Sequence, residues 1–390
     1  MSTVELRGGP QDAGDDWDPR APEVLADQLR AYDAMRGRCP VAHSDHLGWT
    51  LFRHADVVAA ARDHATFSNV VSARVSVPNG MDPPEHTPHR RINERYFTPE
   101  RMARLEPRCR AIAARLVADL PRGGPTEVMD PLARAFALRV QSAFMGWPEE
   151  LEGPLREWTL RNHRASLTRD PDALAAVALE FDTHIRGQIE ARRRDRSAEP
   201  GDVTAELLAE RVDGRPLTDA ELVSLVRNWT VGELSTIAAS VGILVHALAE
   251  RPDVQTLLRR DAAAVPASVD ELLRIHPPLL ANRRRATRDV VVGGRRIPEG
   301  APVTLLWASA NRDEAVTGDP DEFRLDRDPA DNLLYGTGIH ECPGAPLARM
   351  ELRVLVEELL AGTEHLGPVE HAARAASPAS GFTALVVGVR

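Results

Sequence analysis

The sequence predicts a mainly α-helical protein with minor β structure, folded as a single domain over residues 23–390. Long segments carry apolar residues at helical spacing, whereas β-like runs are few and short. Hydrophobic residues make up 43% of the chain and charged residues 27%, which excludes the disordered and collagen-like classes. A length of 390 residues is compatible with two or three domains, but no repeat or low-complexity segment divides this pattern.

The first 22 residues are rich in Gly, Asp and Pro and predict a flexible acidic leader without the apolar segment of a signal peptide. The longest apolar stretch, Ile237 to Ala249, is too short to span a membrane. A formal net charge of −10 argues against nucleic-acid binding. The widely separated Cys39, Cys109 and Cys342 form no disulfide or zinc pattern. We therefore expect a cytoplasmic protein that binds neither nucleic acid nor a membrane.

Apolar residues recur at intervals of three and four in several segments, which predicts amphipathic helices. These helices are expected at Pro22–Arg36, Asp56–His64, Pro99–Leu120, Pro131–Met145, Asp172–Arg194 and Pro343–Glu358. Thr218 and Glu221 form a helix-start signature. The helix that follows should run without a break to about Glu250, across the core.

Strand signals are sparse. Gly48–Phe52 and Ala384–Val389 predict single strands, and Phe67–Pro84 predicts a loop. Val290–Val292, followed by two glycines, then by Ile297 and Pro298 and by Val303–Leu306, predicts a hairpin.

The segment Tyr335–Gly344 (YGTGIHECPG) combines three glycines with a cysteine and a histidine and is the strongest candidate for a functional site. Its glycines permit tight turns around Cys342, and the helix that begins near Pro343 aims backbone N–H groups back at the sulfur. This arrangement favours a thiolate, which is either a metal ligand or a nucleophile. The alternatives from these residues alone are an inert buried cysteine and a cysteine hydrolase in which His340 is the base.

This segment resembles the heme-binding loop of the cytochrome P450 family. Gly336, Gly338, His340, Cys342 and Gly344 match the family's pattern, whereas Tyr335 replaces its usual phenylalanine. The resemblance implies a single-domain cytochrome P450 fold with heme b, iron protoporphyrin IX, between the long central helix and the cysteine-loop helix. It also implies that Cys342 is the iron ligand and that Gly336 and Gly344 help to bind the cofactor.

Two further sets of residues match the family. The resemblance implies that His86, Arg90, Arg284 and His340 bind the heme propionates, although Arg283 or Arg285 could replace Arg284. It also implies that a buried cluster braces the scaffold without taking part in chemistry. That cluster comprises Glu271, Arg274 and Arg327.

The central helix departs from the family at Gly232–Thr236. Thr236 keeps the family's threonine, but Ser235 stands where an acid is usual, and Glu233 stands where glycine is usual. The resemblance makes these three residues the catalytic candidates for proton delivery to dioxygen. A serine can relay a proton but cannot supply a charge, so either the relay is slower or Glu233 or a substrate group takes the task.

The connection from Phe67 to Pro84 is shorter than is usual in the family, which predicts a wider pocket mouth and a bulky substrate. By resemblance, the pocket residues are Val70, Val71, Val75, Leu234, Leu279, Leu280, Ala281 and Phe382.

The resemblance implies a monomeric oxidase or monooxygenase that uses O2 on a natural product, small molecule or short peptide, with electrons from ferredoxin and ferredoxin reductase. Four arginines are expected to offer a basic face to that acidic partner: Arg101, Arg104, Arg108 and Arg110. One alternative is oxidative cross-linking of aromatic side chains in a short peptide. Another is a non-catalytic heme sensor.

Overall fold

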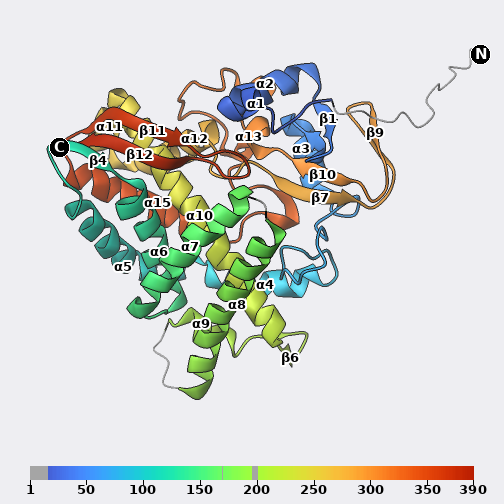
Figure 1. Cartoon of the computed structure of the whole chain (residues 1–390), viewed down its shortest axis with the longest axis horizontal. Coiled ribbons are helices and arrows are strands. Elements are labelled where there is room, and N and C mark those ends of the chain that lie inside the picture. Colours follow the sequence, from blue (N-terminus) through green and yellow to red (C-terminus); the bar gives the residue numbers. More distant parts are fainter. Residues whose placement is uncertain (1–15, 169, 196–200) are drawn as a thin grey trace, which may run out of the picture.

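The computed structural model describes residues 16–168, 170–195 and 201–390. Helices form most of the molecule, and the largest sheet lies on one side of it (Figure 1). This arrangement confirms the predicted mainly α class.

The helices vary in length from single turns to the long α10. In chain order they are α1 Pro22–Ala26, α2 Gln28–Arg38, α3 His54–Arg62, α4 His86–Tyr96, α5 Pro99–Ala118, α6 Ala135–Met145, α7 Glu152–Thr168, α8 Pro171–Arg194, α9 Val203–Leu207, α10 Asp219–Glu250, α11 Pro252–Arg260, α12 Val265–Ile275, α13 Trp307–Ala310, α14 Glu314–Thr317 and α15 Ala345–Gly362.

The strands are short except for the last two. They are β1 Val41–Ser44, β2 Gly48–Leu51, β3 Phe67–Ser68, β4 Gly124–Glu127, β5 Arg211–Val212, β6 Arg215–Pro216, β7 Asn282–Ala286, β8 Val290–Val292, β9 Arg295–Ile297, β10 Pro302–Leu305, β11 Leu366–Arg374 and β12 Phe382–Val389.

The largest sheet has the strand order β1-β2-β10-β7-β3, in which only β10 and β2 run parallel. A three-stranded sheet has the order β11-β12-β4. The predicted hairpin is present, since Val290–Val292 pairs with Arg295–Ile297 across the two glycines. Its predicted extension to Val303–Leu306 is wrong, because Val303 pairs with Trp49 and Arg284 in the large sheet.

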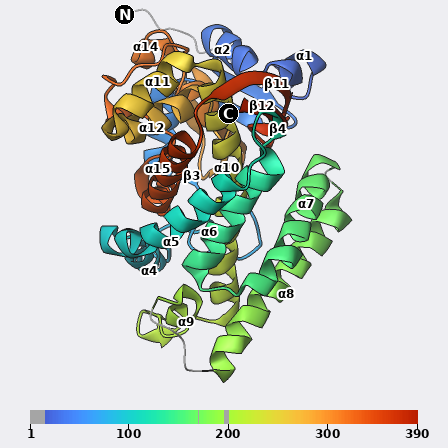
Figure 2. The same cartoon turned by 90° about the vertical axis from the view of Figure 1, so that its left-hand side faces the viewer.

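Helix α10 crosses the middle of the molecule (Figures 1 and 2). It begins in a capping box, in which the Glu221 N–H donates to Thr218 Oγ1 and the Thr218 N–H donates to the Glu221 carboxylate. By length and composition it is also apolar enough to cross a membrane, with a mean hydropathy of 1.6 over its most apolar window. However, 72% of that window is buried inside the protein.

The last residues of the predicted 22-residue leader contact the domain. Residues 1–15 lie outside the described part of the chain, but Trp17 is buried against Tyr32 and Phe52. In addition, the His43 N–H donates to the Asp16 carboxylate at 2.7 Å. The aromatic side chain of Trp17 therefore anchors the last part of this segment to the domain.

Candidate functional site

A cavity of about 730 Å³ lies between α10 and the cysteine loop. Its walls come from the loop that follows β3, from α10, from β7 and from residues 334–348. The cavity therefore joins segments that are far apart in the sequence.

The cysteine loop is held close to α3. A Cβ atom at Gly338 would lie 2.7 Å from the Ala61 carbonyl oxygen, and the residue has φ +79°, so glycine is required there. The Cys342 N–H donates to the Tyr335 carbonyl at 2.9 Å, which turns the loop so that the sulfur lines the cavity.

The Ala345 N–H, at the start of α15, donates to the Cys342 carbonyl at 3.3 Å. Burial raises the pKa of the Cys342 thiol, while the nearby backbone N–H groups of Gly344 and Ala345 act in the opposite direction. A cation at the sulfur, such as iron, would favour the thiolate further. Gly336 and Gly344 both line the cavity beside this sulfur.

A basic cluster borders the same cavity. Arg284 is 5% exposed, and none of the described acidic side chains forms an ion pair with it. Burial lowers its pKa to about 10. The rings of His86 and His340 lie 4.5 Å apart, and the Nε2 atom of each is buried without a hydrogen-bond partner.

Arg90 completes this cluster. Its Nη1 donates to the Glu341 carbonyl at 2.5 Å, and its Nε donates to Glu94 at 2.9 Å. Burial and neighbouring cations lower the pKa of His340 to about 3, so its ring is neutral and can donate one N–H.

These groups fit heme. A buried arginine and two unpartnered imidazole nitrogens require an anionic or acceptor partner, and heme carries two propionates. Arg90, Arg284 and His340 line the cavity, while His86 contacts the His340 ring from outside the lining. Of the three neighbouring arginines, Arg283 and Arg285 are exposed and Arg284 is buried, which favours Arg284 for the propionate.

The α10 segment supplies hydroxyl groups to the cavity. Ser235 Oγ donates to the Val231 carbonyl at 2.9 Å, and Thr236 Oγ1 donates to the Gly232 carbonyl at 2.6 Å. Both residues line the cavity, as does Glu233. The Glu233 carboxyl also reaches Glu351 on α15.

The predicted pocket residues divide into two groups. Val71, Leu279 and Ala281 line the cavity, but the other five do not. Leu234 and Phe382 belong to the helical core, where the Phe382 ring stacks on His246 with a centroid distance of 4.7 Å.

The remaining three lie elsewhere for different reasons. Leu280 packs in the cluster that contains Trp17 and Tyr32. Val70 and Val75 belong to the cavity loop, but they are 49% and 48% exposed and do not line the cavity. A helix or strand presents only some of its side chains to one cavity, so neighbours of lining residues are often excluded.

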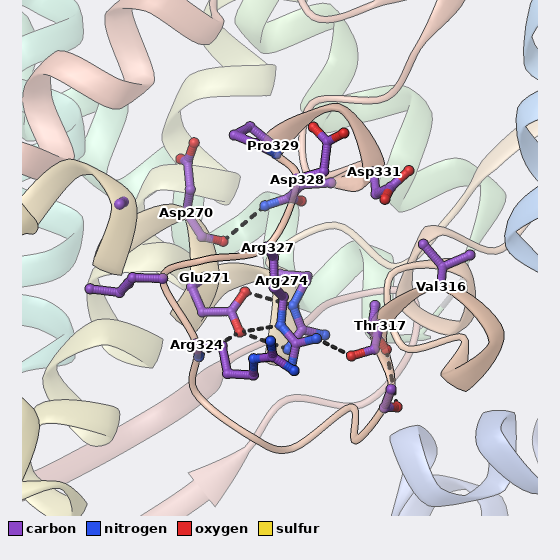
Figure 3. Close-up of a pocket in the computed structure, with 14 residues that line it drawn as sticks. Asp270, Glu271, Arg274, Val316, Thr317, Arg324, Arg327, Asp328, Pro329 and Asp331 are labelled. Atoms are coloured by element: carbon purple, nitrogen blue, oxygen red, sulfur yellow. Dashed lines mark hydrogen bonds and ion pairs between the residues drawn. The ribbon is translucent and has the colours of Figure 1, made fainter.

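Glu271, Arg274 and Arg327 meet beside a second cavity of about 310 Å³ (Figure 3). Arg274 Nε donates to Glu271 Oε2 at 2.7 Å, and Arg327 Nε donates to Glu271 Oε1 at 2.9 Å. Both guanidinium groups also donate to backbone carbonyls, those of Asn311 and Thr317 respectively. The cluster thereby ties α12 to the irregular chain before the cysteine loop.

Sequence reasoning missed several lining residues. Asn228 and Trp229 lie on α10 about two turns before Thr236, and Gln141 and Phe144 lie on α6. Extending the helical spacing back from Thr236 would have identified Asn228 and Trp229, whereas the α6 residues depend on how two helices pack.

The expected basic face is smaller than predicted. Arg101 pairs with Glu206 at 2.5 Å, and Arg110 pairs with Glu357 and Glu358 at 2.6 and 2.7 Å. Arg104 and Arg108 remain exposed.

Comparisons with known proteins agree with this geometry. The cytochrome P450 family model matches residues 157–365. Erythromycin C-12 hydroxylase of Saccharopolyspora erythraea is 33% identical over 86% of this chain and 88% of its own length. Nocardicin C N-oxygenase of Nocardia uniformis is 34% identical over 84% of each chain. The open structure of the cytochrome P450 EryK from S. erythraea superimposes with a TM-score of 0.85 at 30% identity, covering 94% of this chain and 97% of that one.

A cysteine hydrolase and a non-catalytic heme sensor were open alternatives from the sequence. The family match, the share of the chain that its relatives cover and the cavity around Cys342 argue against both of them. The chain therefore belongs to the cytochrome P450 family of oxidoreductases, whose cofactor is heme.

Proposed function

We propose that this enzyme inserts one oxygen atom into a natural-product substrate in specialised metabolism, with electrons from ferredoxin and ferredoxin reductase. The observation that carries the proposal is that Cys342, Ser235 and Thr236 face one cavity. The similarity to Erythromycin C-12 hydroxylase and Nocardicin C N-oxygenase supports oxygen insertion over other oxidations.

In this proposal Cys342 is the iron ligand, and His86, Arg90, Arg284 and His340 hold the propionates. Bound heme supplies the redox chemistry that activates dioxygen. The hydroxyl groups of Ser235 and Thr236 donate to their own helix, so their lone pairs can accept hydrogen bonds from water in the cavity. Val71, Leu279 and Ala281 are the predicted pocket residues that border the substrate.

The substrate enters past the loop between β3 and α4. Among the described residues this loop contains no helix, and Asn69, Arg74 and Asn79 place polar groups on the cavity wall. An open, partly polar wall suits a bulky substrate with its own polar groups. Because an open wall also admits a short peptide, oxidative cross-linking of such a peptide is the second candidate function.

Product mass separates the two functions. The holoenzyme is supplied with ferredoxin, ferredoxin reductase and NAD(P)H, and natural products and aromatic short peptides are offered in parallel. A product heavier by one oxygen atom supports the proposal. A product lighter by two hydrogen atoms would instead establish cross-linking. Turnover without ferredoxin would show that ferredoxin is not the required electron donor.

The ligand assignment has its own test. Cys342→Ala should abolish the carbon monoxide spectrum typical of thiolate-ligated heme. Cys39→Ala is the matched control, because Cys39 lies outside the cavity lining, and it should keep that spectrum. Retention of the spectrum in Cys342→Ala would contradict the assignment.

A further inference from the structure

Among the described residues of the loop between β3 and α4, Arg74 is the charged one that lines the cavity. Its side chain is 49% exposed, and its Nη2 lies 3.2 Å from the Asp182 carboxylate on α8. Asp182 also binds a second arginine, because Arg227 on α10 donates to both of its oxygens, at 2.6 and 2.7 Å. Two guanidinium groups therefore share one carboxylate, and one positive charge of this cluster is uncompensated.

The shared carboxylate is held mainly by Arg227. Its bidentate pair with Asp182 is the strong form of this contact, whereas Arg74 contributes one longer hydrogen bond. If Arg74 turned to another anion, Asp182 would keep its pair with Arg227. The exchange therefore leaves no carboxylate unpaired, and its cost in lost contacts is small.

The loop is tied to α10 on one side of Arg74. The Val77 N–H donates to Ser224 Oγ on that helix at 2.8 Å. In the described part of the chain, the Arg74–Asp182 pair is the one hydrogen bond or ion pair that joins residues 70–74 to a distant segment. Arg74 can therefore change its partner without breaking the contacts that hold the loop on α10.

Apolar side chains accompany this charge at the opening of the cavity. Val71 and Leu279 line the cavity and are 38% and 39% exposed. Exposed apolar side chains on a cavity wall are stabilised by contact with an apolar part of a ligand. The opening therefore suits a molecule that has an apolar body and an anionic end.

The charge of the cavity lining also favours an anion. Among the described lining residues Glu233 is the one carboxylic acid, whereas the arginines are Arg74, Arg90, Arg283 and Arg284. In the proposed function, Arg90 and Arg284 bind the two propionates of heme. Arg74 and Arg283 remain against Glu233, whose pKa is raised to about 7 by burial, so the lining is positively charged before the substrate binds.

The position of Arg74 sets the length of the molecule that it can bind. Arg227, which holds Asp182, lies nine residues before Thr236 on α10, so these two residues are about 13 Å apart along the helix axis. In the proposed function, oxidation occurs in the part of the cavity that Thr236 and Cys342 line. An anion bound at Arg74 is therefore far from the oxidised carbon, which requires an elongated substrate.

We propose that the substrate is an elongated, mainly apolar molecule with a carboxylate, and that Arg74 binds this carboxylate in place of Asp182. One carboxylate replaces another at the same guanidinium group, and no covalent bond changes. The location of the oxidised end rests on the proposed function, whereas binding of the carboxylate at Arg74 does not depend on turnover. Arg74 is thereby the residue that selects substrates by charge.

Binding of dodecanoate and of dodecanamide to the oxidised holoenzyme tests this selection. The two probes have the same apolar chain and differ in the charge of the head group, and calorimetric titration gives the Kd of each. The wild type should bind dodecanoate about tenfold more tightly than dodecanamide. Only the affinity for dodecanoate should fall as the salt concentration rises. Equal affinities for the two probes, or failure of dodecanoate to bind, would overturn the proposal.

Arg74→Gln tests which arginine is responsible. It should weaken dodecanoate binding about tenfold and leave dodecanamide binding unchanged, because the amide forms no ion pair. Arg104→Gln is the matched control, since it alters an exposed arginine outside the lining, and it should change neither affinity. An equal loss for both probes in Arg74→Gln would show that this side chain only orders the loop. A loss in Arg283→Gln but not in Arg74→Gln would place the carboxylate at β7 and refute the role of Arg74.

Asp182→Asn tests the exchange of carboxylates. This variant removes the competing anion, so it should strengthen dodecanoate binding several-fold. Glu180→Gln on the same helix removes a carboxylate that pairs with Arg161, and it should leave the affinity unchanged. Weaker or unchanged dodecanoate binding in Asp182→Asn would refute the exchange. These titrations need neither electrons nor dioxygen, so a failure of oxygen insertion with ferredoxin would refute the proposed function alone.

Discussion

Burial decides what each arginine at the cavity can do. Arg90 donates hydrogen bonds from Nε to Glu94 and from Nη1 to the Glu341 carbonyl. Only its remaining N–H groups are therefore available to bind the cofactor. Arg284 is buried and donates to the Arg283 carbonyl at 2.8 Å, but no described carboxylate pairs with it. A buried cation in this state needs an anion more than an exposed one does.

Arg284→Ala should therefore weaken heme binding more than Arg285→Ala, which alters the exposed neighbour on the same strand. A buried charge-assisted hydrogen bond contributes about 1.5–3 kcal/mol, which corresponds to roughly a ten- to hundredfold loss of affinity. Heme transfer to apomyoglobin measures the dissociation rate of each variant. Equal dissociation rates in the two variants would show that Arg284 does not bind the propionate.

The buried carboxyl group of Glu233 on α10 makes stability depend on pH. The pKa of Glu233 is raised from 4.5 to about 7 in the folded protein, so the native state binds more protons than the unfolded state between these values. Its contribution to stability is fully present below about pH 4.5 and is lost as the pH rises through about 7. The loss is about 3 kcal/mol at 1.36 kcal/mol per pH unit.

Urea unfolding of the holoenzyme at about pH 5 and about pH 8 checks this expectation. The free energy of unfolding should fall with pH more steeply in the wild type than in Glu233→Gln, which has no proton to lose at that position. Parallel pH dependences of the two proteins would show that Glu233 does not titrate in this range.

At the scale of elements, the sequence predicted best what is determined locally. The helices expected at Asp172–Arg194 and from Thr218 to Glu250 match α8 and α10 within a few residues, because each has a long apolar face and a side-chain cap. The Pro22–Arg36 helix is instead two helices, because Asp27 leaves the helical conformation, with φ −147° and ψ 82°, and caps α2. Strand β11 was missed because it depends on pairing with β12.

The same distinction applies to the site. Cys342, Gly338 and His340 belong to one short motif, so their sequence pattern was enough to group them around a cofactor. Glu351 carries no such signal, because its proximity to Glu233 depends on which side chain of α10 faces α15. The five pocket candidates outside the lining show the same limit, since sequence neighbours of a lining residue commonly point elsewhere.

The capping box gives an element-scale prediction for α10. Thr218→Ala removes the side-chain acceptor for the Glu221 N–H and should cost about 1 kcal/mol of folding stability. Thr218→Ser keeps that acceptor and should recover most of the loss. Denaturant titration measures both variants, and equal stability of the two would show that the hydroxyl contributes nothing.

At the scale of the whole molecule, the cofactor site links segments that local interactions alone would not hold together. The walls come from the loop after β3, from α10, from β7 and from the cysteine loop, and they meet around about 730 Å³. Several polar groups at this junction, such as His340 Nε2 and Tyr335 Oη, lack partners within the described chain. The bound cofactor therefore acts as part of the core.

Removing heme should loosen this junction selectively. A ligand that binds only the folded state stabilises it by an amount that rises with its affinity, and local opening follows where native contacts are lost. Backbone hydrogen exchange should accelerate in residues 228–236, 282–286 and 334–344 of the apoprotein. The β11–β12 pair has its own backbone ladder, and none of its residues lines the cavity, so its exchange should change least and serve as the internal control. Adding heme back should restore slow exchange, whereas uniform acceleration along the chain would show that the cofactor stabilises the fold globally and does not act through this junction.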